Sequence, residues 1–364
     1  MKRSLLAFSI LGGVLAACGS TGGSDTTTSL GETPTSTAAV TTQPEAEPTT
    51  TVAAVDELIV YSGRNENFVA PVVEAFTEAT GIEVQVRYGD GTSDLAATLL
   101  NEGETTDADV FWAQDPAWIG AIGDEGLLTQ LPDDILGLVP EAYQDADGQW
   151  VGVTARSRVL VYNPELVSED ELPESVSELV EPGWSGRFGI APGNASFIAF
   201  VSAMELTEGP EATLAWLEGI AANDVQTYDG NGAIVEAVTA GDLDAGLVNH
   251  YYLLQMLADQ GEVAGLNHFL APGDTGALVM ATGAGVLAPS DNQEAATEFV
   301  RYLLSPESQE HFTVNLYEYG LIEGAAVPEG QTPLADLAGP DINLSDLADY
   351  LESSVALIAE SGLS

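Results

Sequence analysis

Buried strands alternate with amphipathic helices between residues 57 and 125. Residues 57–61 form a short apolar run, and apolar residues then recur at helical spacing over 68–79. A second strand, apolar at every other position, follows over 82–88, and a third apolar run spans 108–112. This order of strand, helix, strand, helix and strand predicts a largely parallel sheet covered by helices on both faces.

Polar residues follow the ends of the first and third strands. Arg64 and Asn65 come directly after the first strand, and Gln114 comes after the third. In open α/β sheets, ligands collect beyond the carboxyl ends of the strands. We therefore expect these residues near a binding site.

The chain is long enough for two lobes after residue 55. Residues 152–162 are interpreted as a strand that crosses into a second lobe, and Ser290 is expected to cap a helix over 294–304. The predicted organisation is lobe 1 over 55–155, lobe 2 over 156–275, and a return to lobe 1 with C-terminal helices over 276–364.

The first residues have the pattern of an export signal. A short basic start precedes an apolar stretch over 5–17, and Leu15-Ala16-Ala17-Cys18 stands at the cleavage position. This order resembles the bacterial lipobox, so we predict a lipoprotein signal peptide over 1–17 and lipidation of Cys18. Because Cys18 is the single cysteine of the sequence, it has no partner for a disulfide or a thiolate metal site.

Residues 18–54 are mostly Thr, Ser, Gly, Ala, Pro and Glu. Such a segment cannot bury a core, so we predict a disordered, lipid-anchored tether. A flexible coil of this length reaches roughly 30 to 35 Å. The folded part is therefore expected at the cell surface or in the periplasm, held at the outer face of the cytoplasmic membrane by the lipid alone.

Acidic residues dominate the charge of the chain. The 57 Asp and Glu against 8 Lys and Arg give a formal net charge of −49. Nucleic acid is excluded as a partner, because phosphate binding needs a basic surface. The simplest interpretation of this charge is a solvated acidic shell.

Two adjacent tyrosines, Tyr251 and Tyr252, stand where a strand over 245–248 meets a helix over 253–258. Side chains of neighbouring residues converge at an irregular junction, although they diverge within a regular element. A pair of phenolate oxygens is a donor set that suits ferric iron. The alternative is that both tyrosines are half-buried packing residues with hydrated hydroxyls.

Motifs of catalysis give no positive support for an enzyme. The sequence has no GxSxG, HExxH, Walker A or GxGxxG motif, and His250, His268 and His311 lack metal-ligand spacing. Paired carboxylates for hydrolysis stay open, because 57 acids form many pairs by chance.

The chain resembles the ferric-iron-binding substrate-binding proteins of ABC importers. The resembling segments are 58–65, 76–84, 107–112, 156–162 and 248–252. The resemblance implies an α/β fold of the class II periplasmic-binding-protein kind, with two lobes, each a mostly parallel sheet flanked by helices, joined by crossing strands. It also implies that Tyr251 and Tyr252 are iron ligands.

Other residues are assigned by the same resemblance. Asn65 stands where many relatives have a histidine ligand, and Gln114 stands where some have a glutamate. Val161 stands where some relatives add a tyrosine. Neutral amides at these places weaken ferric binding or leave coordination to an exogenous anion.

The anion, phosphate or carbonate, is expected at residues placed by the resemblance, with two arginines as candidates to neutralise it. These residues are Asn194, Ala195, Ser196 and Asn231, together with Arg64 and Arg158. The small residues are equally typical of turns that open helices, and an arginine among so many acids often forms a structural ion pair.

The predicted function is capture of Fe³⁺ with a synergistic anion between two lobes that close by a hinge. The protein is expected to be a monomer without enzymatic activity that delivers iron to an ABC permease and its ATPase. The alternatives are a protein of the same fold that binds an organic or phosphorylated solute, an exported hydrolase, and a structural surface lipoprotein.

Overall fold

The computed structural model describes residues 57–89, 91–327 and 331–363. The predicted signal peptide over 1–17, the lipidation of Cys18 and the tether over 18–54 lie outside the described residues. Within the described part of the chain, none of the helices combines the length and the apolar character needed to cross a membrane.

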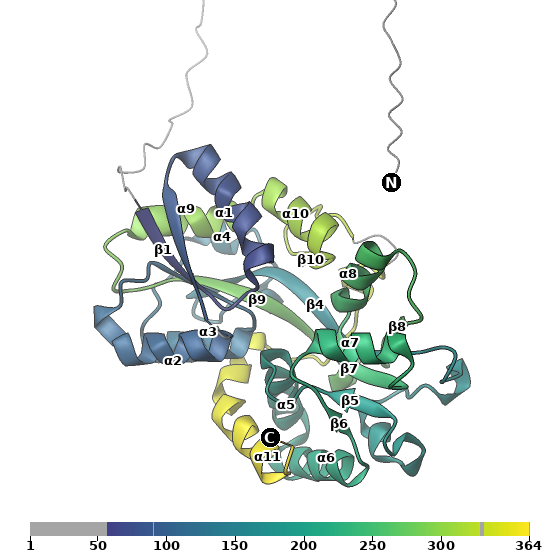
Figure 1. Cartoon of the computed structure of the whole chain (residues 1–364). Helices are drawn as coiled ribbons and strands as arrows, with labels where there is room; N and C mark the ends of the chain where they lie inside the picture. The colour runs from purple at the N-terminus through teal and green to yellow at the C-terminus, as the bar shows by residue number, and fades with distance from the viewer. Residues whose placement is uncertain (1–56, 90, 328–330, 364) are drawn as a thin grey trace, which may run out of the picture. The chain divides into compact units, whose positions relative to one another are not determined.

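Three parallel strands and three helices form the first part of the fold (Figure 1). The elements are β1 (Glu57–Ser62), α1 (Glu66–Thr80), β2 (Glu83–Tyr88), α2 (Thr92–Glu102), β3 (Val110–Ala113) and α3 (Pro116–Asp124). Strand β1 lies between β2 and β3. The predicted order of strands and helices is confirmed, and the carboxyl ends of β1 and β3 meet at one edge.

Local caps set where the loops at this edge turn. The Asn65 side chain accepts a hydrogen bond from the Asn67 N–H at 2.9 Å and caps α1. Asp115 caps α3 by accepting from the Trp118 N–H at 3.1 Å, and Pro116 occupies the first helical position. Capping residues of this kind satisfy N–H groups that have no partner inside the helix. Helices α1 and α3 therefore begin directly after the strands that precede them.

The long strand β4 (Trp150–Tyr162) connects two groups of strands. Its first part, to Ser157, pairs with β9 (Val279–Val286), and its second part, from Arg158, pairs with β7 (Ala245–Asn249). All of its residues are buried. The prediction of a crossing strand is confirmed.

The sheet has the order β2-β1-β3-β9-β4-β7-β5-β6, with β8 and β10 also paired to β4. Strand β9 is antiparallel to β3 and β4, whereas β5 is parallel to β7 and β6. The other strands are β5 (Phe188–Ile190), β6 (Gln226–Thr227), β8 (Leu266–His268) and β10 (Tyr319–Gly320). Each group therefore contains three parallel strands, joined through antiparallel β4 and β9.

The remaining helices flank these strands (Figure 1). The α-helices are α4 (Asp133–Leu136), α5 (Ala195–Glu208), α6 (Pro210–Ala222), α7 (Asn231–Ala240), α8 (Tyr251–Gln260), α9 (Gln293–Leu303), α10 (Pro306–Leu316) and α11 (Leu351–Glu360). The 3₁₀ helices are η1 (Gly103–Thr105), η2 (Glu141–Tyr143), η3 (Glu169–Glu171), η4 (Val176–Val180), η5 (Pro182–Trp184), η6 (Thr275–Ala277), η7 (Leu334–Asp336) and η8 (Leu344–Tyr350).

Strand β4 contributes to two hydrophobic cores through its alternating side chains. Leu160 belongs to the larger core, whereas Val159 and Val161 belong to a smaller core that includes Val248 of β7 and Ile234 of α7. This alternation follows from the period of two in a strand. The smaller core holds α7 against the strand that leads to the tyrosine pair.

One expectation about the later chain differs from the structure. Ser290 was expected to cap the helix that follows it, but α9 begins at Gln293 and has no side-chain cap. The Ser290 hydroxyl instead accepts a hydrogen bond from the N–H of Asn292, which precedes the helix. Helix α11 packs against α5 and α6, which lie within residues 156–275. The C-terminal helix therefore contacts the second group of strands and helices, whereas β9, in the same range of the chain, pairs with β3 and β4.

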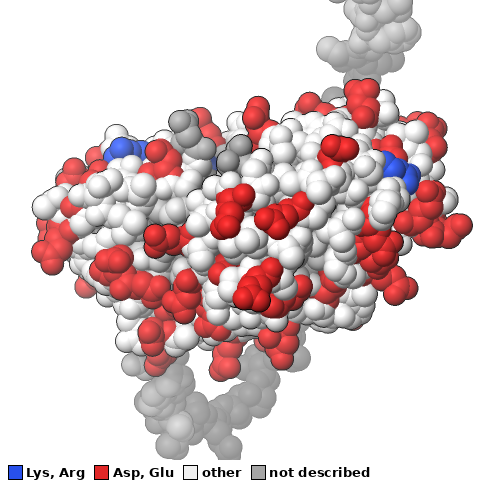
Figure 2. All heavy atoms as spheres, turned by 90° about the horizontal axis from the view of Figure 1, so that it is seen from below, with Lys and Arg blue, Asp and Glu red and all other residues white. Residues whose placement is uncertain are grey.

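The exposed charge is almost entirely negative. Figure 2 shows acidic side chains scattered across the visible face and few basic side chains among them. The three partly exposed arginines, Arg87, Arg187 and Arg301, each form an ion pair with a nearby carboxylate. Among the described residues, these arginines therefore form no continuous basic patch.

Candidate functional site

The tyrosine pair lies at the junction of β7 and α8, as the sequence predicts. Strand β7 ends at Asn249, and Tyr251 and Tyr252 are the first two residues of α8. Their rings stack with centroids 4.4 Å apart and planes inclined by 24°. The predicted convergence of the two side chains is confirmed. Their position in the first helical turn places both phenols in the positive field of the helix N-terminus.

Both tyrosines line a cleft of about 300 Å³. A water molecule occupies about 30 Å³ of liquid, so the cleft has room for a cation with a small anion. The lining residues are Gly63, Asn65, Phe68, Gly91, Thr92, Ser93, Gln114, Gly193, Asn194, Ala195, Ser196, Asp229, Tyr251 and Tyr252. The structure thus gathers seven of the predicted site residues from four separate loops and helix starts into one cleft.

One wall of the cleft is the N-terminus of α5. Asn194 caps this helix, and its Oδ1 accepts from the Ser196 N–H at 3.1 Å and from the Ser196 hydroxyl at 2.6 Å. Asn231 is buried, and its amide N–H lies 3.4 Å from both Asn194 Oδ1 and Ser196 Oγ. Asn249 also donates to Ser196 Oγ, at 3.2 Å. Polar side chains and a helix N-terminus therefore meet where the anion was expected.

The two arginines predicted for anion binding do not line the cleft. The Arg64 guanidinium contacts the Glu318 carboxylate at 2.7 Å, with both side chains fully buried. Arg158 donates to the Asn249 Oδ1 at 3.2 Å and to the Leu247 carbonyl at 3.0 Å. The geometry of Arg64 matches the alternative of a structural ion pair, and Arg158 acts on the cleft through Asn249.

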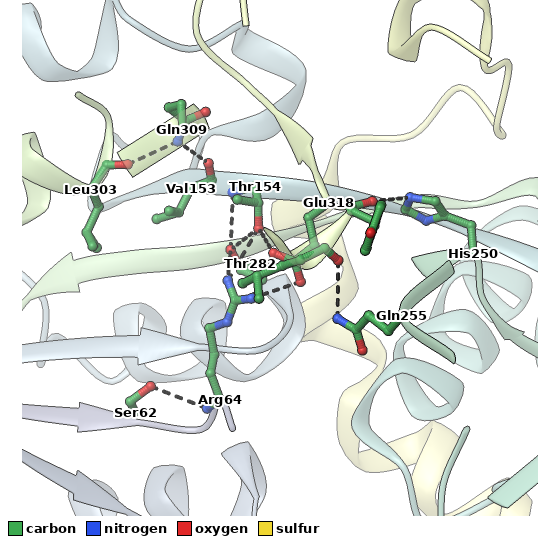
Figure 3. Close-up of polar contacts among 12 residues, drawn as sticks. Ser62, Arg64, Val153, Thr154, His250, Gln255, Thr282, Leu303, Gln309 and Glu318 are labelled. Carbon is green, nitrogen blue, oxygen red and sulfur yellow. Dashed lines mark hydrogen bonds and ion pairs between the residues drawn. The ribbon is translucent and has the colours of Figure 1, made fainter. Parts of the chain in front are cut away.

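Figure 3 shows the network around Arg64. Its guanidinium also lies 3.3 Å from the Thr154 hydroxyl of β4 and 3.4 Å from the Thr282 hydroxyl of β9, and Thr154 donates to Glu318 at 2.7 Å. The four residues come from four separate segments of the chain. The network therefore ties the β1–α1 turn, which carries Asn65, to the strands that cross the sheet.

Burial sets the charge state of Tyr251 before any ligand binds. Tyr251 is fully buried, and its burial raises its pKa well above the ordinary value, because a phenolate there loses its water. The negative fields of Tyr252 and Glu318 act in the same direction, and the Arg156 guanidinium opposes them. A cation that binds Tyr251 must therefore displace a proton.

Arg156 and Asp115 are residues near the site to which the sequence assigns no role. Arg156 is fully buried, and its three guanidinium nitrogens have no hydrogen-bond partner in the described part of the chain. Burial raises the pKa of Asp115 to about 6, and the positive charge of Arg156 partly offsets this. The scarcity of arginine is the one sequence signal that points to Arg156.

Asp229 is a third residue that sequence reasoning missed. It lies just before α7 and lines the cleft. No motif marks it, because it is one acid among 57.

His250 links the junction of β7 and α8 to neighbouring segments of the chain. Its Nδ1 accepts from the Ser157 N–H at 3.2 Å, and its Nε2 donates to the Tyr317 carbonyl at 2.9 Å. Its ring stacks on Tyr319 with centroids 4.7 Å apart. Burial lowers the pKa of His250 to about 4, so the ring is neutral at physiological pH.

The unfolding free energy of wild type is expected to fall in mild acid, and replacing His250 with glutamine is expected to make this fall smaller. In the unfolded chain, His250 has its ordinary pKa of 6.5. Between pH 6.5 and 4, the unfolded chain therefore binds a proton at His250, whereas the folded chain does not. From about pH 7.5 to 5, this histidine should remove about 2 kcal/mol from the unfolding free energy. Urea unfolding of metal-free protein at both pH values measures the difference. An equal fall with pH in His250→Gln and wild type would contradict this assignment.

Comparison with known proteins places the chain in a family. The family model described as bacterial extracellular solute-binding protein matches residues 72–321. The chain belongs to this family. The solute-binding protein is 36% identical over 309 residues to the Fe(3+)-binding periplasmic protein of Serratia marcescens, covering 84% of this chain and 90% of the relative. It is 32% identical to the major ferric iron-binding protein of Neisseria meningitidis serogroup B, covering 85% and 94%.

Solved structures agree with the fold of the solute-binding protein. Iron-bound HitA from Pseudomonas aeruginosa superposes with a TM-score of 0.81 at 33% identity, covering 84% of this chain and 99% of that chain. The apo ferric ion-binding protein A of Pasteurella haemolytica gives a TM-score of 0.77 at 25% identity, covering 85% and 98%. The periplasmic-binding-protein fold predicted from the sequence is confirmed, and family membership makes this chain a binding protein and not an enzyme.

Proposed function

We propose that this solute-binding protein captures Fe³⁺ in the cleft beside Tyr251 and Tyr252 and delivers it to the permease and ATPase of an ABC importer. The observation that carries the proposal is the pair of stacked phenols at one end of a cleft sized for a small ion and its anion. Relatives named as ferric-iron-binding proteins match this chain over most of its length, which supports the same cargo.

The proposed ligand set contains both phenolates and the amide oxygens of Asn65 and Gln114. These amides line the same cleft and follow the ends of β1 and β3. Amide oxygens are weak partners for a trivalent cation, and Asn65 Oδ1 already accepts from the Asn67 N–H. Two phenolates and two neutral amides leave a net positive charge at the metal, so a further anionic donor is required.

Phosphate or carbonate is one proposed source of that donor, held at Asn194, Ala195 and Ser196, with Asn231 behind them. The N-terminus of α5 supplies a favourable field for an anion there. A related structure, from Trichodesmium, is described as a complex with iron and citrate; it superposes with a TM-score of 0.74 at 25% identity. Arg64 remains a predicted anion ligand without support from its geometry.

Ligand capture is proposed to close two lobes, one over 55–155 and one over 156–275. The cleft is lined from both ranges, and Phe68 of α1 already meets Tyr251 of α8 edge to face at 6.4 Å between centroids. A ligand that contacts both lobes shifts the equilibrium toward the closed state.

The chain is further proposed to be a monomer held at the outer face of the cytoplasmic membrane by lipid on Cys18. The Leu-Ala-Ala-Cys order after an apolar stretch supports the anchor. Labelling of growing cells with radioactive palmitate tests it: the protein should carry label, and Cys18→Ser should not. Unlabelled wild-type protein would reject the anchor.

Ferric titration of the purified chain tests the proposed function. Iron bound by tyrosinate absorbs visible light, so the solution should become coloured as the cleft fills. A chain that stays colourless with phosphate, carbonate and citrate each supplied would reject iron as the cargo.

A further inference from the structure

Asp229 is the one carboxylate among the described residues that line the cleft. The other polar side chains on its wall are the two phenols, hydroxyls and amides. Asp229 and the two phenols line the same cleft, so a cation held there by the phenolates shares that space with this carboxylate. Asp229 is thus the one anionic donor besides the two phenolates that the described lining residues offer there.

The loop that carries Asp229 is fixed on both sides. On one side, the Tyr228 N–H donates to the Ile190 carbonyl at 2.9 Å, which extends the pairing of β6 with β5. On the other side, buried Asn231 contacts Asn194 and Ser196, each at 3.4 Å. Asp229 is therefore held beside the same residues that were expected to hold an exogenous anion.

No structural role accounts for this carboxylate. Helix α7 begins at Asn231, after Gly230, and no side chain caps it. Asp229, the residue before Gly230, therefore does not act as its cap. Within residues 57–89, 91–327 and 331–363, Asp229 forms neither an ion pair nor a hydrogen bond. Its side chain is exposed and free to turn toward the cleft.

Charge favours the carboxylate over an added anion. A ferric ion with two phenolates keeps one positive charge, which a single carboxylate neutralises. A phosphate dianion at the same wall would lie beside the negative charge of Asp229, and like charges repel.

We propose that Asp229 is a further ligand of the ferric ion and takes the position that a synergistic phosphate or carbonate would otherwise fill. The inference rests on the proposed function, because it assumes that the cleft binds iron. It implies that the protein binds iron without any added anion. It also accounts for the neutral amides at Asn65 and Gln114, since Asp229 supplies the missing negative charge from the loop before α7.

The test uses the purified full chain, stripped of metal, in buffer free of phosphate and carbonate. Ferric chloride is added, the tyrosinate absorption is followed, and affinity is measured by competition with EDTA. Wild type should form the band without added anion. Asp229→Asn, which keeps the shape and removes the charge, should bind at least about 10-fold more weakly and should recover when phosphate is added.

Asp242→Asn is the matched control, because it makes the same charge change at an exposed position beyond the other end of α7. It should bind iron like wild type, and thermal unfolding should show that both variants are folded. Equal affinity of Asp229→Asn and wild type, or a wild-type band that requires phosphate, would overturn the role of Asp229 and leave iron binding intact. A wild type that forms no band with or without phosphate would instead reject the proposed function.

Discussion

Replacing Tyr251 with phenylalanine is expected to lower the affinity for Fe³⁺ at least about 100-fold. The variant removes one charged oxygen from a site where loss of supporting groups alone costs about 10- to 100-fold in metal affinity. Tyr252→Phe should have an effect of similar size, because the two rings stack at 4.4 Å and line the same cleft. Competition with EDTA measures both affinities.

Tyr143→Phe is a suitable control for the tyrosine variants. Tyr143 lies in η2 and lines a different hollow, together with residues near the C-terminus. This variant should bind iron as tightly as wild type. Wild-type affinity in Tyr251→Phe and Tyr252→Phe would show that these tyrosines are packing residues, which is the alternative that the sequence leaves open.

Replacing Glu318 with glutamine is expected to lower the unfolding free energy by about 3 to 5 kcal/mol. Glu318 and Arg64 are both fully buried and 2.7 Å apart, so the variant leaves an uncompensated cation in the interior. The buried Arg156 adds to the penalty, because its positive charge also acts on Arg64. Urea unfolding of the metal-free protein measures the loss.

The double variant Arg64→Met with Glu318→Gln separates charge from packing. It leaves no unpaired charge at this position, so it should recover most of the lost stability. Glu102→Gln breaks the exposed pair with Arg87 and should change stability little. Equal losses in the single and double variants would mean that contacts other than the ion pair explain the effect.

The strands, the main helices and the tyrosine junction could be predicted because each depends on neighbouring residues. The apolar run that ends at Asn249 and the helical spacing that follows fix the junction locally. Gln114 could be placed at the cleft because parallel strands bring their carboxyl ends to one edge. These features need only periodicity and topology.

The features that could not be predicted depend on partners far apart in the chain. Glu318 lies 254 positions from Arg64, and the sequence offers 57 acids from which to choose. Asp229 could not be predicted either, because only the pairing of β6 with β5 brings it to the cleft. The packing of α11 on α5 and α6 likewise follows from tertiary contacts and not from local pattern.

The most direct test of the iron site is a ferric titration of the metal-stripped protein, followed by visible absorption. We expect a tyrosinate-to-iron band that grows to one equivalent and then stops, and that is absent when Tyr251 and Tyr252 are both phenylalanine. A protein that gives no band, with phosphate, carbonate and citrate each tried, would contradict iron as the cargo and assign the cleft to another solute.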